Sequence, residues 1–370
     1  MTIGTVKEIK IGENRVGLTP AGVHTLTQKK HIVLIQKDAG VGSGFSNEDY
    51  KKAGAEIVAQ AGAVYKRSHM IVKVKEPQPS EFPSLRKDLI LFTYFHLAAE
   101  KRLTEELLKR KIKAVAYETV ELSDRSLPLL TPMSEVAGRM GVHIGAYFLQ
   151  KPNGGKGKLI TSVPGTLPAK VVILGTGVVS TNAAKVAIGM GADVTMLGRN
   201  LERLRELDDI FGATVKTRAS HQLIIEEEVS KADLVISGVY ITGEKAPHLI
   251  TKQMLKTMEP GTVIVDVAID QGGSTDTSKP TTHEHPIYEV DGIIHYCVTN
   301  MPGAVPRTST IALTNATLPY VLNIAQQGLE NAAKQDASLM KGINTYDGKL
   351  TCNGVAKAFN ITYQEVEAIW

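Results

Sequence analysis

The sequence is poor in cysteine and in aromatic residues, and it has no long apolar run. Its two cysteines, Cys297 and Cys352, cannot form the disulfide framework of a small secreted protein, and we expect two buried thiols in a reducing compartment. No apolar stretch approaches the roughly 20 residues that span a membrane. The opening MTIGTVKEIK lacks the basic and apolar regions of a secretory signal. We therefore expect a cytoplasmic protein without a membrane partner.

A strong charge of one sign is also absent, since the formal net charge is +4 over 370 residues. One basic cluster, Lys151, Lys156 and Lys158, lies among glycines and could touch phosphates. It lacks the interleaved aromatic residues that stack on bases, so a solvated loop is the favoured interpretation. We expect no nucleic-acid partner.

Short apolar runs alternate with amphipathic stretches along most of the chain, which is typical of parallel sheets covered by helices. Helices are expected over 20–29, 100–110, 134–151, 178–190, 201–209 and 251–258, and a helical pattern returns from Ser309 to the C-terminus. Strands are expected over 32–36, 70–74, 89–95, 113–117, 170–174, 193–197, 233–237, 262–267 and 293–298.

The length favours two domains, and the pattern changes near residue 130, where Thr131 and Pro132 begin a long helix. An economical arrangement inserts residues 131–306 as one domain into a second domain made of 1–130 and 307–370. The predicted fold class is α/β, with two Rossmann-like domains whose parallel sheets are flanked by helices.

The clearest motif is a glycine loop between a buried strand and a helix. Residues 170–174 lead directly into Gly175-Thr-Gly-Val-Val-Ser180. Gly175 permits the tight turn, and Gly177 lets the backbone approach a pyrophosphate at the helix N-terminus. Ser180 stands where glycine or alanine is usual. Placed between this strand and this helix, the motif predicts dinucleotide binding, whereas a tight turn without a ligand is the alternative.

The next strand should end in an acid that binds the adenine ribose hydroxyls, and here it ends at Gly198. Arg199 and Asn200 follow, with Arg203 one helical turn on. Without the acid, a 2′-phosphate is not repelled, and the arginines could attract it. NADP is therefore expected to be tolerated or preferred, unless the arginines are merely solvated.

Three ionisable residues follow predicted strands, at the edge of an open α/β sheet where ligands bind. These are Lys75, His96 and Asp270. A cation that holds a carboxylate, a near-neutral base and an acid are what dehydrogenation of an amino or hydroxy acid requires. Glu118 also follows a strand, but the sequence offers it no partner. His283-Glu-His285 lacks a third ligand, so a polar loop is favoured there and no metal site is expected.

Several segments together resemble the alanine dehydrogenase/pyridine nucleotide transhydrogenase family over essentially the whole chain. They include Glu13-Asn-Arg-Val-Gly-Leu-Thr-Pro20, Val72-Lys-Val-Lys-Glu-Pro77, Leu91-Phe-Thr-Tyr-Phe-His96, Pro132-Met-Ser-Glu-Val-Ala-Gly-Arg139, Val265-Asp-Val-Ala-Ile-Asp-Gln-Gly-Gly273 and Asn300-Met-Pro-Gly-Ala-Val-Pro-Arg-Thr-Ser309.

The resemblance to alanine dehydrogenase implies reversible oxidative deamination of L-alanine to pyruvate and ammonium with NAD(H), in a homohexamer. It implies that Arg15 and Lys75 bind the substrate and that His96 and Asp270 are catalytic. The domain of residues 1–130 and 307–370 would hold the substrate. The resemblance, together with the glycine loop and the strand ends, places the cofactor at Ser134, Gly175, Gly177, Val178, Val179, Gly198, Arg199, Arg203, Ser220, Val239, Val267, Ala268, Ile269, Asp270, Val298, Asn300 and Met301.

Two other functions stay open at this point. A nucleotide-binding subunit of a proton-translocating transhydrogenase would share the fold, although the set of Arg15, Lys75, His96 and Asp270 favours alanine chemistry. A nucleotide-sensing protein without catalysis would share the glycine loop. An alanine-dependent reduction of NAD(P) separates an enzyme from a sensor.

Overall fold

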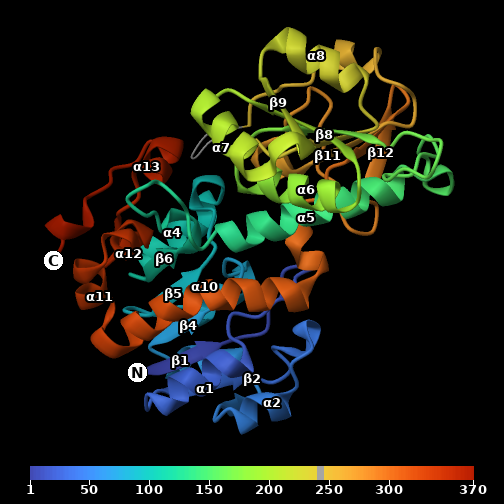
Figure 1. Cartoon of the computed structure of the whole chain (residues 1–370). Helices are drawn as coiled ribbons and strands as arrows, with labels where there is room; N and C mark the ends of the chain where they lie inside the picture. Colours follow the sequence, from blue (N-terminus) through green and yellow to red (C-terminus); the bar gives the residue numbers. More distant parts are fainter. Residues whose placement is uncertain (240–245) are drawn as a thin grey trace. The chain divides into compact units, whose positions relative to one another are not determined.

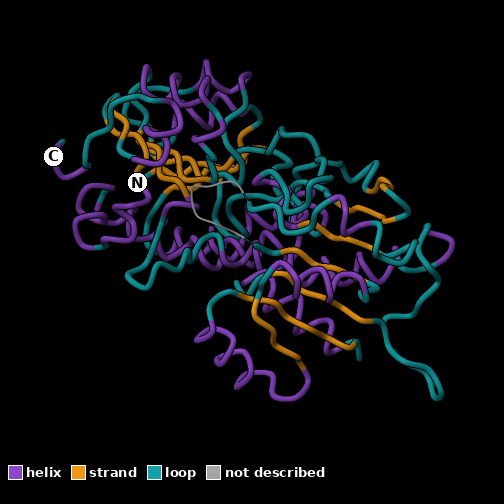
Figure 2. The backbone as a smooth tube through the Cα atoms, turned by 90° about the horizontal axis from the view of Figure 1, so that it is seen from above, coloured by secondary structure: helices purple, strands orange, loops and turns teal. Residues whose placement is uncertain are grey.

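The computed structural model describes residues 1–239 and 246–370. The chain forms two compact units, the first made of Met1–Met133 with Gly303–Trp370 and the second of Ser134–Pro302 (Figure 1). Each unit contains one sheet, and helices flank the strands of each (Figure 2). The fold is α/β, as predicted, with the second unit inserted in the sequence of the first.

The sheet of the first unit has the strand order β15-β14-β6-β5-β4-β1-β2-β3. Strands β1 to β6 pair in parallel, whereas β14 and β15 are antiparallel additions at one edge. Its strands are β1 (Thr2–Thr5), β2 (Ile32–Gln36), β3 (Glu56–Val58), β4 (Met70–Val72), β5 (Ile90–Thr93), β6 (Lys113–Ala116), β14 (Ile343–Tyr346) and β15 (Lys349–Leu350). Its helices are α1 (Pro20–Gln28), α2 (Asn47–Lys52), α3 (Ala61–Arg67), α4 (Lys101–Lys109), α10 (Pro306–Gln327), α11 (Leu329–Gln335), α12 (Ala337–Gly342) and α13 (Asn353–Phe359).

The sheet of the second unit has the order β12-β13-β11-β10-β7-β8-β9, and only the edge strand β12 is antiparallel. Its strands are β7 (Lys170–Leu174), β8 (Asp193–Gly198), β9 (Val215–Ala219), β10 (Leu234–Ser237), β11 (Val263–Asp266), β12 (Ile287–Val290) and β13 (Ile293–Tyr296). Its helices are α5 (Thr131–Phe148), whose first turn belongs to the first unit, α6 (Val178–Gly189), α7 (Leu201–Phe211), α8 (Gln222–Ser230) and α9 (Lys252–Leu255).

Apolar runs of the sequence form the central strands because both faces of each sheet are covered. Val171 to Leu174 on β7 and Val263 to Val265 on β11 are fully buried. Glycines let α5 pack closely in the second unit: a Cβ on Gly145 would lie 2.4 Å from a methyl of Leu234. A larger residue there would meet the side chain of Leu234, which would have to shift.

The all-helical C-terminal tail expected from the sequence is wrong in part, since β14 and β15 interrupt it. Asp347 and Gly348 join the two strands, and both have positive φ, 42° and 81°. This is the two-residue turn that Asp-Gly favours in hairpins, so the signal was present in the sequence. The helix expected over 251–258 is also shorter, ending at Leu255.

The expectation of two buried thiols is confirmed for Cys297, whereas Cys352 is only half-buried. Burial raises the pKa of the Cys297 thiol to about 11, which makes it a poor nucleophile at neutral pH. Within residues 1–239 and 246–370, no helix is long and apolar enough to cross a membrane.

Candidate functional site

The first unit gathers its candidate residues at one edge of its sheet. Strands β1, β4, β5 and β6 are neighbours and parallel, so their carboxyl ends lie on the same side. Lys75 follows β4, His96 follows β5 and Glu118 follows β6, while Arg15 lies in the loop between β1 and α1. Four chemically active side chains thus come from elements that share an edge.

Arg15 is almost fully buried, with 2% of its surface exposed. Glu13 holds the guanidinium from one side, with Nε donating to Oε1 at 2.7 Å and Nη2 to Oε2 at 2.5 Å. Burial lowers the pKa of Arg15, but the hydrogen bonds and charge of Glu13 outweigh it and leave the pKa raised. The loop passes close over β4, since a Cβ on Gly17 would lie 2.4 Å from the carbonyl oxygen of Val72. Arg15 is therefore a fixed cation.

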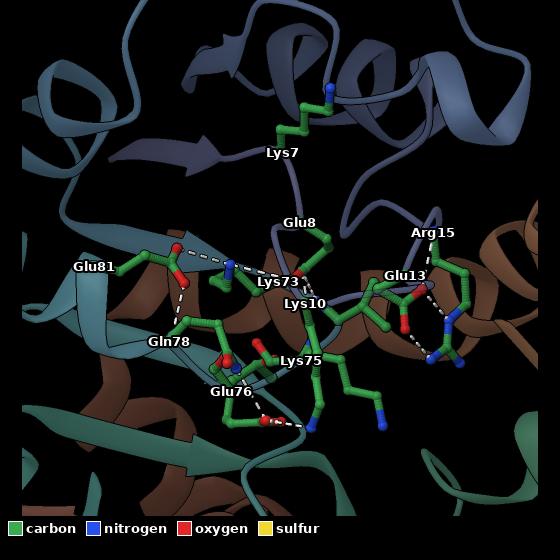
Figure 3. A network of polar contacts seen from close by, with 12 residues as sticks. Lys7, Glu8, Lys10, Glu13, Arg15, Lys73, Lys75, Glu76, Gln78 and Glu81 are labelled. Atoms are coloured by element: carbon green, nitrogen blue, oxygen red, sulfur yellow. Dashed lines mark hydrogen bonds and ion pairs between the residues drawn. The ribbon is translucent and has the colours of Figure 1, made fainter. Parts of the chain in front are cut away.

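Lys75 follows β4 next in sequence to a second set of buried charges, drawn in Figure 3. Lys73 points into the protein with 1% exposure and pairs with Glu8 at 3.2 Å and Glu81 at 3.0 Å. Glu8 also accepts the backbone N–H of Val74 at 2.7 Å and of Lys75 at 3.3 Å. The network therefore fixes the backbone from which Lys75 projects.

Burial sets the charge state of this network. It raises the pKa of Glu8 despite the opposing effects of Lys73 and the Val74 N–H. Burial lowers the pKa of Lys73, but the two glutamates more than compensate and leave it raised. Lys73 accordingly stays protonated, and its removal would leave two carboxyl groups buried without a cation.

His96 is exposed and adopts a left-handed conformation, with φ 52° and ψ 40°. The carboxylate of Glu118 stabilises this strained backbone. Its Oε1 accepts the N–H of His96 at 2.6 Å and of Phe95 at 3.0 Å. The sequence could not identify this partner, because it is a backbone group 22 residues away on another strand end.

In the second unit, the predicted cofactor residues lie mostly at the carboxyl edge of the sheet. The exception is Ser134, which is half-buried near the start of α5. The others follow six parallel strands. They are the Gly175 loop with Val178 and Val179 after β7, Gly198, Arg199 and Arg203 at and after β8, Ser220 after β9, Val239 after β10, Val267 to Asp270 after β11, and Val298, Asn300 and Met301 after β13.

The glycine loop has the geometry that a pyrophosphate requires. Gly175 has φ +106°, which L side chains rarely adopt. Gly177 is the N-cap of α6 without a side-chain cap, and a Cβ on it would meet no atom within 4 Å. No side-chain cap at Gly177 accepts from the N–H groups of the first turn of α6, which are the groups that bind an anion at a helix end. The residues present fit a dinucleotide.

Ser180 replaces the usual third glycine without opening the structure. Its side chain is fully buried, and its hydroxyl donates to the carbonyl oxygen of Leu174 at 3.3 Å. A Cβ on Gly238 would lie 2.8 Å from the same hydroxyl. Close packing of helix and strand is therefore kept by a glycine on a neighbouring strand end.

Two aspartates after β11 have different surroundings. Asp266 is fully buried and accepts the N–H of Ala268 at 3.0 Å, the N–H of Ser274 at 2.7 Å and the hydroxyl of Ser278 at 2.5 Å. Asp270 is exposed, in the short helical turn Val267–Gln271. Asp266 thus fixes the turn that presents Asp270. In residues 1–239 and 246–370, no group of three or more His, Cys, Asp or Glu side chains could hold a metal ion.

Comparisons with known proteins agree with this arrangement. Two family models match, the alanine dehydrogenase/PNT N-terminal domain over residues 4–137 and the C-terminal domain over residues 141–353. An alanine dehydrogenase of Methanococcus maripaludis and alanine dehydrogenase 2 of Staphylococcus aureus are each 55% identical to this chain over 99% of both proteins.

Solved structures give the same result. An L-alanine dehydrogenase matches with a TM-score of 0.94 and 50% identity, covering 97% of this chain and 99% of its own. A transhydrogenase of Sinorhizobium meliloti matches with a TM-score of 0.82, covering 95% of this chain and 99% of its own, but it is 21% identical and shows a shared fold alone. By its domains, its relatives and its structure, the chain belongs to the alanine dehydrogenase/PNT family.

Proposed function

We propose that this chain is an NAD(P)-dependent alanine dehydrogenase, which catalyses the reversible oxidative deamination of L-alanine. Relatives of that name at 55% identity over 99% of the chain carry the proposal. The set of Arg15, Lys75 and His96 at the edge of one sheet agrees with it, since an amino acid needs a cation for its carboxylate and a base for its proton.

The reaction balances as L-alanine plus NAD(P)⁺ plus water giving pyruvate, ammonium, NAD(P)H and one proton. When bound, the nicotinamide accepts the hydride from Cα of alanine. The protein's part is to hold the substrate, to remove protons from nitrogen and water, and to return protons as ammonia leaves.

Arg15 is suited to the substrate carboxylate. Glu13 occupies one edge of the guanidinium, and Nη1 faces the thioether sulfur of Met133 at 3.0 Å. Sulfur is a weak acceptor, so a carboxylate oxygen would replace it with a stronger, charge-assisted bond. We assign Lys75 to the carboxylate and carbonyl region of the same substrate.

His96 is assigned as the main acid and base. A neutral imidazole takes the proton from the alanine ammonium, and after water has added to the imine it helps to move protons toward the departing amine. Asp270 is assigned to the same proton transfers near the amine. Both side chains are exposed, as groups that must reach a substrate should be.

The nucleotide is assigned to the carboxyl edge of the second sheet, with its pyrophosphate at the Gly175–Gly177 loop. NAD(H) follows from the family. We propose that NADP(H) is also accepted or preferred, because Gly198 offers no carboxylate to a 2′-phosphate. The homohexamer that the resemblance implies and the cytoplasmic location expected from the sequence stay predictions.

The test is the L-alanine-dependent formation of reduced nicotinamide by the purified chain. His96→Ala and Asp270→Asn are each expected to lower kcat about 100-fold or more, since general acid–base groups contribute that much. Exposed residues provide matched controls, His283→Ala and Asp209→Asn, which should keep the wild-type rate. A wild type without alanine-dependent turnover would leave a nucleotide sensor. A near-normal kcat in either site variant would remove that residue from the mechanism.

A further inference from the structure

A side chain at position 198 would meet the side chain of Thr176 in the glycine loop. A Cβ built on the buried Gly198 would lie 2.3 Å from the Cγ2 methyl of Thr176 and 3.2 Å from Cδ2 of Leu204. The first distance is too short for two carbon atoms. Thr176 therefore fills the volume in which a side chain at residue 198 would begin.

A hydrogen bond to its carbonyl oxygen fixes the backbone of Thr176. It lies between Gly175 and Gly177, and its carbonyl oxygen accepts a hydrogen bond from Nε of Arg203 at 3.1 Å. The Cβ of Thr176 lies 3.5 Å from the constructed Cβ at 198, which is an ordinary contact. Within Thr176 the conflict thus comes from the methyl, and Cδ2 of Leu204 at 3.2 Å adds a second, milder contact.

The arginines near the end of β8 differ in whether an acidic residue already pairs with them. Arg203 donates to Thr176 and, from Nη2, to the hydroxyl of Thr181 at 3.3 Å, and it pairs with Glu206 at 2.6 Å. Arg205 pairs with Glu202.

Arg199, directly after Gly198, is exposed and makes no hydrogen bond or ion pair with any residue in 1–239 or 246–370. On the neighbouring strand β9, Arg218 pairs with Glu227 at 3.0 Å and with Glu228. Arg199 is thus the one cation of this group, within the described chain, that has no acidic partner.

We propose that Thr176 and Gly198 form a steric pair that keeps a carboxylate away from the adenosine ribose, and that Arg199, rather than Arg203, selects a nucleotide with a 2′-phosphate. This inference rests on the proposed dinucleotide site. Arg203 braces the glycine loop and serves either nucleotide.

The arginines are tested by calorimetric binding of NADH and of NADPH to the full chain. Arg199→Gln should weaken NADPH about tenfold or more, the value of one charge-assisted contact, and change NADH by less than about twofold. Arg203→Gln should weaken both nucleotides by a similar factor. Equal losses for both nucleotides in Arg199→Gln would overturn the assignment of Arg199.

The steric pair is tested with three variants in the same assay. Gly198→Asp alone should fail to tighten NADH, because the new side chain meets the methyl of Thr176. Thr176→Ala with Gly198→Asp removes the methyl and should tighten NADH about tenfold relative to the single variant, while NADPH stays weak through charge repulsion. Thr176→Val with Gly198→Asp keeps the branched volume and should behave like Gly198→Asp. A single Gly198→Asp variant that equals the Thr176→Ala double variant would refute the pair.

Thermal unfolding keeps the test valid if an aspartate variant folds poorly. Gly198→Ala should lower Tm in the wild-type background and less so beside Thr176→Ala. Equal shifts in both backgrounds would contradict the steric pair. A wild-type chain that binds neither nucleotide refutes the proposed function itself. A chain that binds both while the Arg199 and Thr176 variants fail to discriminate refutes only this inference.

Discussion

At the carboxyl edge of the first sheet, charged side chains are held by other charged side chains, whereas at the corresponding edge of the second sheet the backbone is held by glycines and one buried aspartate. Arg15 is fixed by Glu13, and the backbone of Lys75 is fixed by Glu8, which pairs with Lys73. The second edge depends on Gly175 at φ +106° and on the open N-cap Gly177.

This difference follows from the ligand each edge is proposed to bind. A small amino acid offers one carboxylate and one amine, so its binding requires a few point charges in fixed places. A pyrophosphate is long and has many oxygens, and backbone N–H groups at a helix end bind it without any side chain. Removing a charge should therefore damage the structure or ligand binding of the first edge, and adding a Cβ should damage those of the second.

The largest effect is expected from Lys73→Met in the first unit. It leaves Glu8 and Glu81 buried without their cation, which should cost about 3–5 kcal/mol of stability. Urea unfolding of the purified chain measures the loss. The control is Lys51→Met, which breaks an exposed pair with Glu48 and should change stability by less than about 1 kcal/mol. Equal losses in the two variants would show that the buried network is not what holds this edge.

The second effect separates two glycines of the same loop. Gly175→Ala forces a Cβ into the φ +106° conformation, 3.0 Å from the hydroxyl of Ser180, and should cost about 1–3 kcal/mol. Gly177→Ala meets no atom and should keep its stability, while nucleotide binding weakens because the methyl faces the anion. Thermal unfolding and NADH titration of both variants measure the split. Similar behaviour of the two would contradict the distinct roles given to them.

These two regions were predictable to different degrees. The glycine loop could be identified from local sequence, since strand, turn and helix lie within about twenty consecutive residues. Lys75, His96 and Asp270 could be placed at strand ends for the same reason. Their supports could not: Glu8 reaches Val74 across 66 residues, and Glu118 reaches His96 across 22. Such pairs form only when parallel strands are aligned, and one sequence does not show that register.

The strands show the same limit. The buried strands β2 and β7 match their predicted residues 32–36 and 170–174, because continuous apolar runs identify them. The short strands β1 and β3 and the polar edge strand β9 had no such run, and the sequence did not reveal them. Pairing with neighbours determines those strands more than their own composition does.

A third effect is a pH dependence of stability at the carboxyl edge of the first sheet. Burial raises the pKa of Glu76, but the 2.5 Å pair with Lys10 outweighs it, so the pKa in the folded protein is lowered. A lowered pKa adds stability above the pKa of the unfolded chain, about 4.3, and this stability is lost as the pH falls through the folded pKa. Glu76→Gln should therefore cost about 1 kcal/mol at neutral pH and less near pH 4.

Unfolding of wild type and Glu76→Gln at the two pH values measures this difference. Glu48→Gln is the exposed control and should show almost no cost at either pH. A cost for Glu76→Gln that is the same at both pH values would rule out the ion pair with Lys10 as its source.

The smallest effect is expected from Glu118→Gln, which weakens the support of the His96 backbone without removing it. An amide oxygen still accepts one N–H but loses the charge, so kcat/KM for alanine should fall about threefold to tenfold. Steady-state kinetics across pH measures the fall. Glu121→Gln, which breaks the pair with Lys341 at 2.8 Å, is the neighbouring control and should match wild type. If kcat/KM across pH is the same in Glu118→Gln as in the wild type, Glu118 does not support the catalytic position of His96.

The amination assay asks whether the proposed substrate and nucleotide sites serve one reaction. Purified chain is given pyruvate and NADH, then pyruvate and NADPH, each with and without ammonium, and loss of the reduced nicotinamide is followed. We expect oxidation that requires both pyruvate and ammonium and yields alanine, and we expect NADPH to be accepted in place of NADH. Oxidation independent of ammonium, or none with either nucleotide, would contradict it.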